Sequence, residues 1–273
     1  MTSPAMTRAG IWGASGFIGG ALCAAAEARG WAVRKLPRGG ADTTALAGID
    51  IAYHCAGKAM ETDPEGYVRA AERFARACAE AKVKRLVYLG TVAVYGVRFS
   101  GAIGTDAPLA GVGAYAQSRI QAEHALQSAL AAGPTRLCIL RVPAIIGRGM
   151  RGTVITRFAR AVGWGLFVHP GPAEATLACL GVRRLAEILV RTGELPSPPR
   201  IAQFADHLRW TAIAARVGAQ RGQRIARLRI PALGGKLRLL ASTARYADDS
   251  ASLFGPDAGL PATAQDLDAA LRP

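Results

Sequence analysis

Short apolar runs alternate with longer stretches of helical periodicity over the first half of the chain. The apolar runs predict strands, and the amphipathic stretches predict helices. The predicted strands cover residues 9–12, 32–36, 50–54, 85–89 and 137–141, and the predicted helices cover 17–29, 64–82 and 112–132. Strands that alternate with helices in this way form parallel sheets from βαβ units. The pattern therefore predicts an α/β fold with a Rossmann-type, doubly wound parallel sheet over residues 1–143.

The pattern changes after residue 143, where the predicted elements become shorter and less regular. Glycines and prolines crowd residues 147–152, 170–172 and 195–199. Such clusters mark turns and loops between short elements. This change predicts a small C-terminal α/β substrate lobe over residues 144–273, with two later crossings back to the main sheet.

The segment between the second and third predicted strands is unusually short. Only the thirteen residues 37–49 separate these strands. A helix, a strand and a return do not fit comfortably in that length. We therefore expect one edge strand of the usual sheet to be missing or vestigial.

Composition narrows the class of protein. Of the 273 residues, 51% are hydrophobic and 19% are charged, so the chain can bury a sizeable core. No apolar run approaches the ~20 residues that a membrane span needs, and the N-terminus lacks a secretory signal pattern. The five cysteines are widely spread without a CxxC pair, and no two histidines have metal-ligand spacing. These features predict a soluble cytoplasmic protein with reduced thiols and no metal site.

The net charge of +15 suggests an anionic partner. Residues 183–247 contain twelve arginines and one lysine against three acidic residues, a local net charge of 13 − 3 = +10. A nucleotide-type substrate or a nucleic acid would fit this charge. However, the arginines are spread singly, without interleaved aromatics or a nucleic-acid-binding motif. Arginine also outnumbers lysine 29 to 5, as a GC-rich genome would produce. We therefore favour a small-molecule substrate over nucleic acid.

A glycine-rich turn follows the first predicted strand. Its sequence, Gly13-Ala-Ser-Gly-Phe-Ile-Gly19, opens the first predicted helix. Glycines at this spacing allow a tight turn and close approach of a pyrophosphate, which then lies at the helix N-terminus. A glycine-rich turn without a ligand is the alternative interpretation. The candidate cofactor-binding residues here are Gly13, Ser15, Gly16, Phe17, Ile18 and Gly19.

Further motifs follow at matching positions along the chain. These are Asp50–Gly57, Leu89–Gly96 with Thr91, Tyr115-Ala-Gln-Ser-Arg119 and Leu140–Pro143. With the glycine-rich turn, they make nearly the whole chain resemble the extended short-chain dehydrogenase/reductase family. The resemblance is narrower to the NAD-dependent epimerases and dehydratases, and especially to bacterial surface-polysaccharide nucleotide-sugar epimerases and reductases.

The resemblance implies hydride transfer between a nicotinamide ring and a hydroxyl or keto carbon of a sugar-like, activated substrate. Tyr115 would exchange a proton with the substrate oxygen, and Thr91 would hydrogen-bond the same oxygen. The family has a lysine where this chain has Arg119. In the family, the charge of that lysine lowers the tyrosine pKa, and its ammonium group binds the nicotinamide ribose. Arginine keeps the charge, so we expect some depression of the Tyr115 pKa, but its planar fork does not automatically reproduce the ribose contact.

This departure leaves two functional hypotheses open. One is an active NAD(P)-dependent oxidoreductase or epimerase with Thr91, Tyr115 and Arg119 as its catalytic residues. The other is a dinucleotide-binding sensor or partner protein that has lost catalysis.

The resemblance also locates further cofactor-binding residues. In the family, an acidic residue binds the adenosine ribose. This chain has Pro37 at that position, with Arg34 and Arg38 nearby in the sequence. This change favours NADP(H) over NAD(H). The remaining candidates line the strand ends: Cys55, Ala56, Gly57, Tyr115, Arg119, Val142 and Pro143.

The substrate residues depart further from the family. The arginine that binds a sugar-nucleotide diphosphate aligns near Leu177, and the asparagine expected after Gly152 is Thr153. These departures argue against a standard UDP-sugar site, although Arg148, Arg151 or Arg183 could supply the charge from elsewhere. The candidate substrate residues are Val92, Arg148, Arg151 and His169.

Other residues are assigned to packing. We expect His54 to support the strand that it ends, Cys55 to be a buried thiol, and His124 and His207 to lie on helix surfaces. Members of the family often form homodimers through the two helices that correspond to residues 64–82 and 112–132. The apolar periodicity of these helices suits a dimer face and a sheet-packing face equally well.

Overall fold

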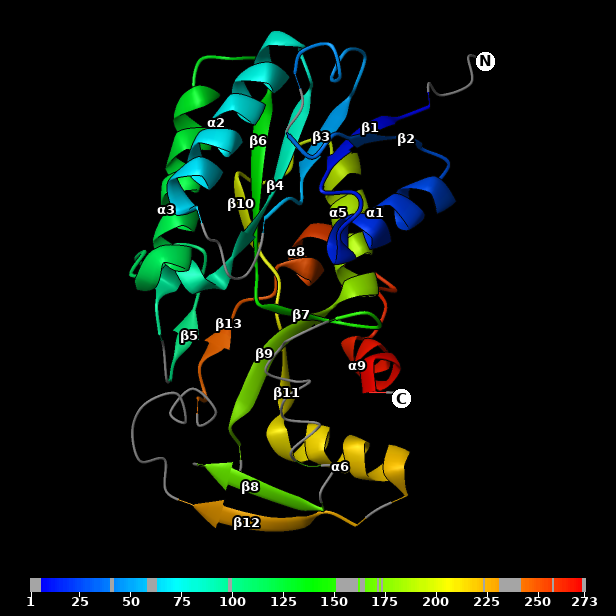
Figure 1. Cartoon of the computed structure of the whole chain (residues 1–273), viewed down its shortest axis with the longest axis vertical. Coiled ribbons are helices and arrows are strands. Elements are labelled where there is room, and N and C mark those ends of the chain that lie inside the picture. Colours follow the sequence, from blue (N-terminus) through cyan, green and yellow to red (C-terminus); the bar gives the residue numbers. More distant parts are fainter. Residues whose placement is uncertain are drawn as a thin grey trace.

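The computed structural model describes most of the chain. It covers residues 6–39, 42–57, 63–97, 100–150, 162, 165–170, 172, 174–222, 224–230, 242–256 and 258–271. A large layered unit holds the N-terminal half, and a smaller lobe lies at one end of it (Figure 1). Within the described ranges, no helix is long and apolar enough to cross a membrane.

The main sheet has six strands, all parallel. Their spatial order is β10-β6-β4-β3-β1-β2. The strands are β1 (Arg8–Trp12), β2 (Ala32–Leu36), β3 (Ile51–His54), β4 (Arg85–Thr91), β6 (Arg136–Val142) and β10 (Ile201–Gln203). Every residue of the central strand β3 is buried because helices cover both faces of the sheet. The predicted Rossmann-type parallel sheet is confirmed.

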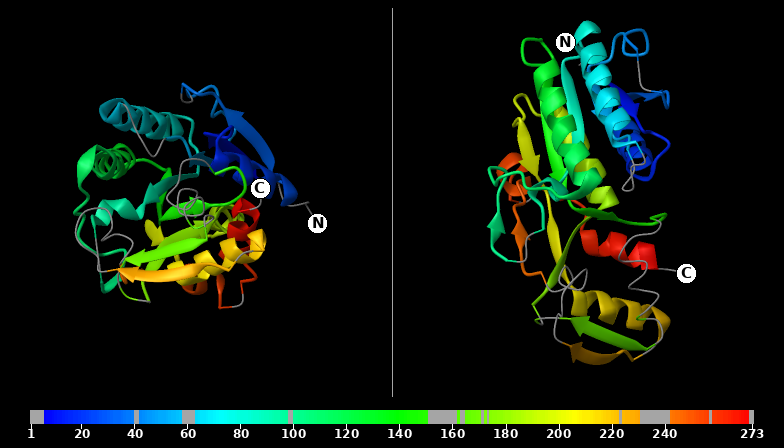
Figure 2. Two further views of the ribbon diagram at one scale, coloured as in Figure 1. Left: turned by 60° about the horizontal axis from the view of Figure 1, so that its bottom comes forward. Right: turned by 60° about the vertical axis from the view of Figure 1, so that its left-hand side comes forward.

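Helices pack on both faces of this sheet. On one face, α1 (Phe17–Ala28) packs against α5 (Val182–Glu194). On the other face, α2 (Pro64–Glu80) and α3 (Gly113–Ala129) lie side by side, as Figure 2 shows. The helix α2 begins where its N-cap Asp63 accepts a hydrogen bond from the backbone of Gly66. All three predicted helices are present, and their ends lie within three residues of the predicted ends.

The described sheet ends at β2, so the expected loss of an edge strand is confirmed. The segment after β2 turns back across the sheet instead of adding a helix and a strand. Leu46 and Ile49 from this segment pack beside Trp12 and Leu36. The Arg34 guanidinium closes the turn, because its Nη1 donates to the carbonyl oxygens of Ala45 and Ala47, each at 2.9 Å.

The lobe consists of short sheets and helices below the main sheet. A three-stranded sheet has the order β11-β9-β7, and two pairs, β12-β8 and β13-β5, complete the strands. The strands are β5 (Ala102–Ile103), β7 (Ala144–Ile146), β8 (Leu166–Pro170), β9 (Thr176–Gly181), β11 (Asp206–Arg209), β12 (Ala226–Ile230) and β13 (Arg245–Tyr246). The helices are α6 (Trp210–Arg221), α8 (Ser250–Phe254) and α9 (Thr263–Leu271). Two elements from this half of the chain return to the main sheet: α5 packs beside α1, and β10 pairs with β6.

One expectation about the lobe is wrong. His207 lies in strand β11 and is half-buried, whereas the sequence places it on a helix surface. Antiparallel pairing with β9 holds this segment extended, and His207 Nε2 accepts a hydrogen bond from the backbone N–H of Tyr246 at 3.1 Å. His124 is exposed on α3, as expected. All five cysteines are free thiols.

Candidate active site

The glycine-rich turn joins β1 to α1 in a conformation that only glycine adopts easily. Gly13 has a φ of +91°, and a Cβ there would lie 2.7 Å from the backbone at Cys55 and Ala56. A Cβ on Gly19 would collide with the Gly13 carbonyl, so the helix lies directly against the turn. The α1 N-terminus has no side-chain cap and no acidic residue in its first turn. These features fit the pyrophosphate of a dinucleotide, because the unpaired N–H groups and the helix dipole favour an anion.

A cavity of about 930 Å³ lies at the carboxyl ends of the sheet strands, between the main sheet and the lobe. Ligands of open α/β sheets bind at this edge. The cavity brings together many residues that the sequence predicts as a site. These are Ile18, Cys55, Ala56, Gly57, Thr91, Val92, Tyr115, Arg119, Val142 and Pro143.

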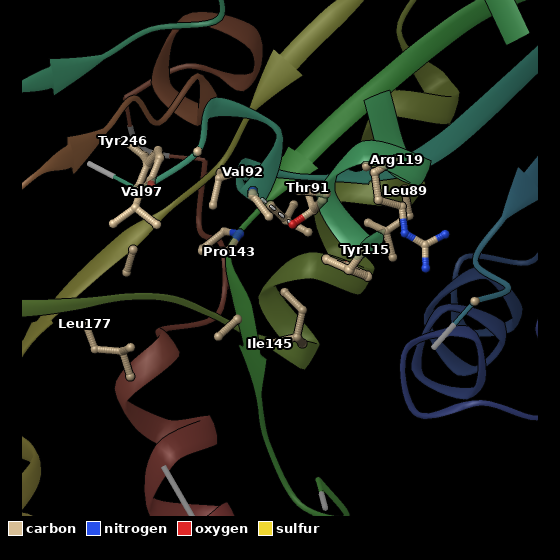
Figure 3. Close-up of a pocket in the computed structure, with 18 of the residues that line it drawn as sticks. Leu89, Thr91, Val92, Val97, Tyr115, Arg119, Pro143, Ile145, Leu177 and Tyr246 are labelled. Carbon is tan, nitrogen blue, oxygen red and sulfur yellow. Dashed lines mark hydrogen bonds between the residues drawn. The ribbon is translucent and has the colours of Figure 1, made fainter. Parts of the chain in front are cut away.

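Thr91 and Tyr115 meet at the wall of this cavity (Figure 3). Thr91 is the last residue of β4, and its Oγ1 accepts a hydrogen bond from the Ala93 N–H at 3.2 Å, which starts the short 3₁₀ helix η1 (Val92–Tyr95). Tyr115 lies in the first turn of α3 and is half-buried. Burial raises the pKa of Tyr115, and a side-chain hydrogen bond with Thr91 acts in the opposite direction.

Arg119 lies one helical turn after Tyr115 and is buried. Its guanidinium carbon is 3.5 Å from the ring centroid of Tyr67 and 4.8 Å from that of Tyr115. Tyr67 comes from α2, so the guanidinium stacks where the two helices face each other. Gly57 makes room for it, because a Cβ there would lie 2.9 Å from Arg119 Nη2.

The expected depression of the Tyr115 pKa is wrong for this structure. Burial dominates and raises the pKa, and the hydrogen bond with Thr91 is the one cause that lowers it. The Arg119 guanidinium lies nearer to the Tyr67 ring, at 3.5 Å, than to the Tyr115 ring, at 4.8 Å, and its charge is not among the causes that shift the Tyr115 pKa.

His54 ends β3, and the next residue, Cys55, is partly buried and lines the cavity. His54 is fully buried, and its ring packs edge-on against Trp12, Tyr67 and Tyr88. Burial, with a smaller contribution from the charge of Arg119, lowers the pKa of His54 to about 3. Burial raises the pKa of the Cys55 thiol to about 12, so it is protonated at neutral pH. Complete burial favours a packing role for His54, whereas Cys55 is a protonated thiol at the cavity wall.

Other predicted residues lie outside the cavity. Arg34 contacts the turn after β2, as described above, and Arg38 is exposed at the end of that strand. Arg148 lines a second cavity of about 490 Å³ beside the start of α5. His169 lies in strand β8, but its side chain and Arg151 fall outside the described residues. The phosphate-loop residues other than Ile18 lie at the start of α1: Gly13, Ser15, Gly16, Phe17 and Gly19.

Several lining residues carry no recognisable signal in the sequence. Tyr67 is one tyrosine within an ordinary amphipathic helix, and only the packing of α2 on α3 brings it to Arg119. Trp210 and Tyr246 reach the cavity from the lobe, more than 90 residues after Tyr115. Among the described residues, no group of three or more histidine, cysteine or acidic side chains is placed to hold a metal ion.

The sheet order and the glycine-rich turn define a dinucleotide-binding α/β protein of the Rossmann class. The chain belongs to the NAD dependent epimerase/dehydratase family, whose sequence model matches residues 9–172, more than half of its 273 residues. No curated protein matches the chain.

Solved structures show the same fold at low sequence identity. The NDP-hexosamine 5,6-dehydratase TunA of tunicamycin biosynthesis is 21% identical with a TM-score of 0.76, over 97% of this chain and 96% of that one. UDP-glucuronic acid 4-epimerase from Bacillus cereus, solved with NAD, is 16% identical with a TM-score of 0.75, over 97% of each chain. RMD from Pseudomonas aeruginosa, solved with NADPH, is 17% identical with a TM-score of 0.76, over 97% and 98%.

Proposed function

We propose that this protein is an NAD(P)-dependent oxidoreductase or epimerase that acts on a hydroxyl or keto carbon of a sugar-like ring. The observation that carries the proposal is that Thr91 and Tyr115 line one cavity beside the dinucleotide-binding turn. Gly13, Gly16 and Gly19 would hold the pyrophosphate of the cofactor at the start of α1. A bound nicotinamide supplies hydride acceptance or return at the substrate carbon.

The chain's own groups handle the proton. The Tyr115 hydroxyl would donate its proton to a keto oxygen that is being reduced, or in its phenolate form take the proton of a hydroxyl that is being oxidised. The Thr91 hydroxyl would hydrogen-bond the same substrate oxygen and hold it beside the Tyr115 hydroxyl. Since burial raises the Tyr115 pKa, donation is the easier direction at neutral pH. Arg119 contributes positive charge at this wall.

The Tyr115→Phe variant tests this assignment. Removing the hydroxyl abolishes proton exchange, so we expect kcat to fall about 100- to 10,000-fold with keto-sugar substrates. Tyr53→Phe is the matched control, because the buried Tyr53 hydroxyl bonds the Leu189 carbonyl outside the cavity and its loss should leave turnover unchanged. Full turnover by Tyr115→Phe would exclude the assignment.

We propose NADP(H) as the preferred cofactor. The support is Arg38, exposed after β2 where the family carries an acidic residue at Pro37. Arg34 belongs to the same proposal, through the guanidinium nitrogens that the turn at Ala45 does not use. Calorimetry should show tighter binding of NADPH than of NADH, and Arg38→Ala should weaken NADPH roughly ten- to hundredfold while sparing NADH. The control is Arg69→Ala, which removes an exposed arginine on α2.

A second candidate function is a dinucleotide-binding sensor or partner protein without catalysis. The position of Arg119 on the Tyr67 ring, together with the raised Tyr115 pKa, favours it. This function predicts that NADPH binds, that a screen of keto-sugars shows no turnover, and that Arg119→Lys creates none. Turnover by the unchanged protein would reject it.

A further inference from the structure

The cavity is strongly asymmetric in charge and polarity. Among its described lining residues, Arg119 alone carries a formal charge. In Figure 3 its guanidinium points away from the end where Val97, Leu177 and Tyr246 lie. The charged end adjoins the dinucleotide-binding turn through Ile18 and Gly57. At the other end, formed by the lobe, the described lining residues are mainly apolar, and Thr176 and Ser242 add hydroxyl groups.

Apolar side chains from four separate elements form the lobe end. Ile145 comes from β7, Leu177 from β9, Trp210 from α6 and Tyr246 from β13, and all four line the cavity. Elements distant in the sequence thus converge with one chemical character. Sites with mostly apolar walls bind ligand groups that lose water contact on entry.

The mouth of the cavity exposes further apolar surface. Val97 is 53% exposed and Val112 is 82% exposed, and both line the cavity. They are two of the three large hydrophobic side chains that are exposed among the described residues. Their position around one opening is an independent indication that an apolar group covers them when the site is filled.

Leu177 marks the position where a charged ligand would need a partner. By resemblance, the arginine that binds a nucleotide diphosphate aligns near this residue. Leu177 instead pairs across the lobe sheet with Leu208 and presents an apolar side chain to the cavity. A diphosphate placed against Leu177 would lose hydration without gaining a counter-charge from that side chain or from another described lining residue at this end.

We propose that the lobe end of the cavity binds an uncharged, apolar substituent of the substrate instead of a nucleoside diphosphate. The substrate is then a neutral ring with a hydroxyl or keto carbon at Tyr115 and an alkyl-like group that reaches Leu177, Trp210 and Val97. The orientation of this ring rests on the proposed function, whereas the binding of the apolar group does not.

A series of 4-alkylcyclohexanones tests the proposal with the full chain and NADP⁺, which cannot reduce the ketone during the titration. Methyl, propyl and pentyl substituents extend one ring ketone by apolar groups only. We expect the dissociation constant from calorimetry to fall by up to roughly fourfold for each methylene that becomes buried. UDP serves as the diphosphate probe and should bind more weakly than the pentyl compound. A flat series, or tighter binding of UDP, would overturn the proposal.

Two variants locate the binding to the lobe end. Val97→Thr keeps the shape of an exposed side chain, so folding is preserved, and it should reduce the gain from the pentyl group by up to roughly fourfold. Leu177→Arg should remove the dependence on alkyl length and strengthen UDP binding. Ala24→Arg, on the exposed face of α1, is the control with an equal added charge and should change neither. Unchanged alkyl dependence in both test variants would place the apolar group elsewhere and reject the assignment.

Binding and turnover separate the two proposals. Alkyl-dependent binding, with neither NADPH consumption nor epimerisation of any keto-sugar in the screen, would support the apolar site and contradict the proposed reaction. NADPH consumption or epimerisation with a keto-sugar nucleotide, together with a flat alkyl series, would support the reaction and contradict the apolar site.

Discussion

Two buried arginines lie at helix α3 in different environments: Arg119 belongs to the helix, and Arg141 reaches it from β6. Arg141, on β6, forms an ion pair with Glu123 at 2.7 Å and donates to the Tyr95 hydroxyl at 2.8 Å. Arg119 has its guanidinium 3.5 Å from the centroid of Tyr67 and lines the cavity. The charge of Arg141 is neutralised inside the protein, so this residue is structural. The Arg119 guanidinium lies over two tyrosine rings and lines the cavity, so a ligand in the cavity can contact it.

The largest expected effect concerns the ion pair. Glu123→Gln leaves Arg141 buried without its counter-charge, and we expect the free energy of unfolding to fall by about 3–5 kcal/mol. Urea denaturation at neutral pH measures this change. The control is Glu72→Gln, which removes an exposed pair with Arg76 and should cost about 0.5 kcal/mol or less. Similar losses in the two variants would mean that Arg141 is not held by charge pairing.

The next effect is a pH dependence at the aromatic cluster behind Arg119. His54 has a pKa of about 3 in the folded state against 6.5 in the unfolded chain. The unfolded state therefore binds the extra proton below about pH 6.5, and stability is lost as the pH falls from there towards 3. At about pH 4.5 the loss amounts to about 2–3 kcal/mol. Urea unfolding of His54→Phe at neutral pH and at about pH 4.5 should lack this loss of stability.

Two further variants sharpen this pH prediction. His124→Phe, at an exposed position on α3, should keep the full dependence on pH. Arg119→Met removes a charge that lowers the His54 pKa, so the loss of stability should begin to level off at a higher pH. An unchanged acid limb in His54→Phe would contradict the assignment to His54.

The smallest expected effect is the coupling of Arg119 to Tyr67. A double-mutant cycle of Tyr67→Leu and Arg119→Met isolates this coupling, because other contacts of each side chain cancel. We expect a coupling free energy of about 0.5–2 kcal/mol, the range for a partly or fully desolvated cation–π contact. If the losses in free energy of unfolding are additive in urea denaturation, the contact between Arg119 and Tyr67 contributes nothing. The two arginines would then not differ in the way proposed.

The sequence predicted the main sheet and its helices well because their signals are local. Alternating apolar runs and helical periods mark β1 to α3 within about three residues, and the short segment 37–49 reveals the lost edge strand. The lobe was less predictable. Its strands are short, and pairing partners distant in the sequence hold them, as β9 holds the segment with His207.

The sequence alone determined which chemical groups are available to the candidate site, namely Gly13–Gly19, Thr91, Tyr115 and the arginine at position 119. What those groups contact was decided by the tertiary structure. The packing of α2 on α3 brings Tyr67 to Arg119 and leaves the Tyr115 pKa raised by burial. The convergence of β9, α6 and β13 gives the cavity its apolar end. Contacts and burial of this kind depend on segments far apart in the chain, so no local pattern encodes them.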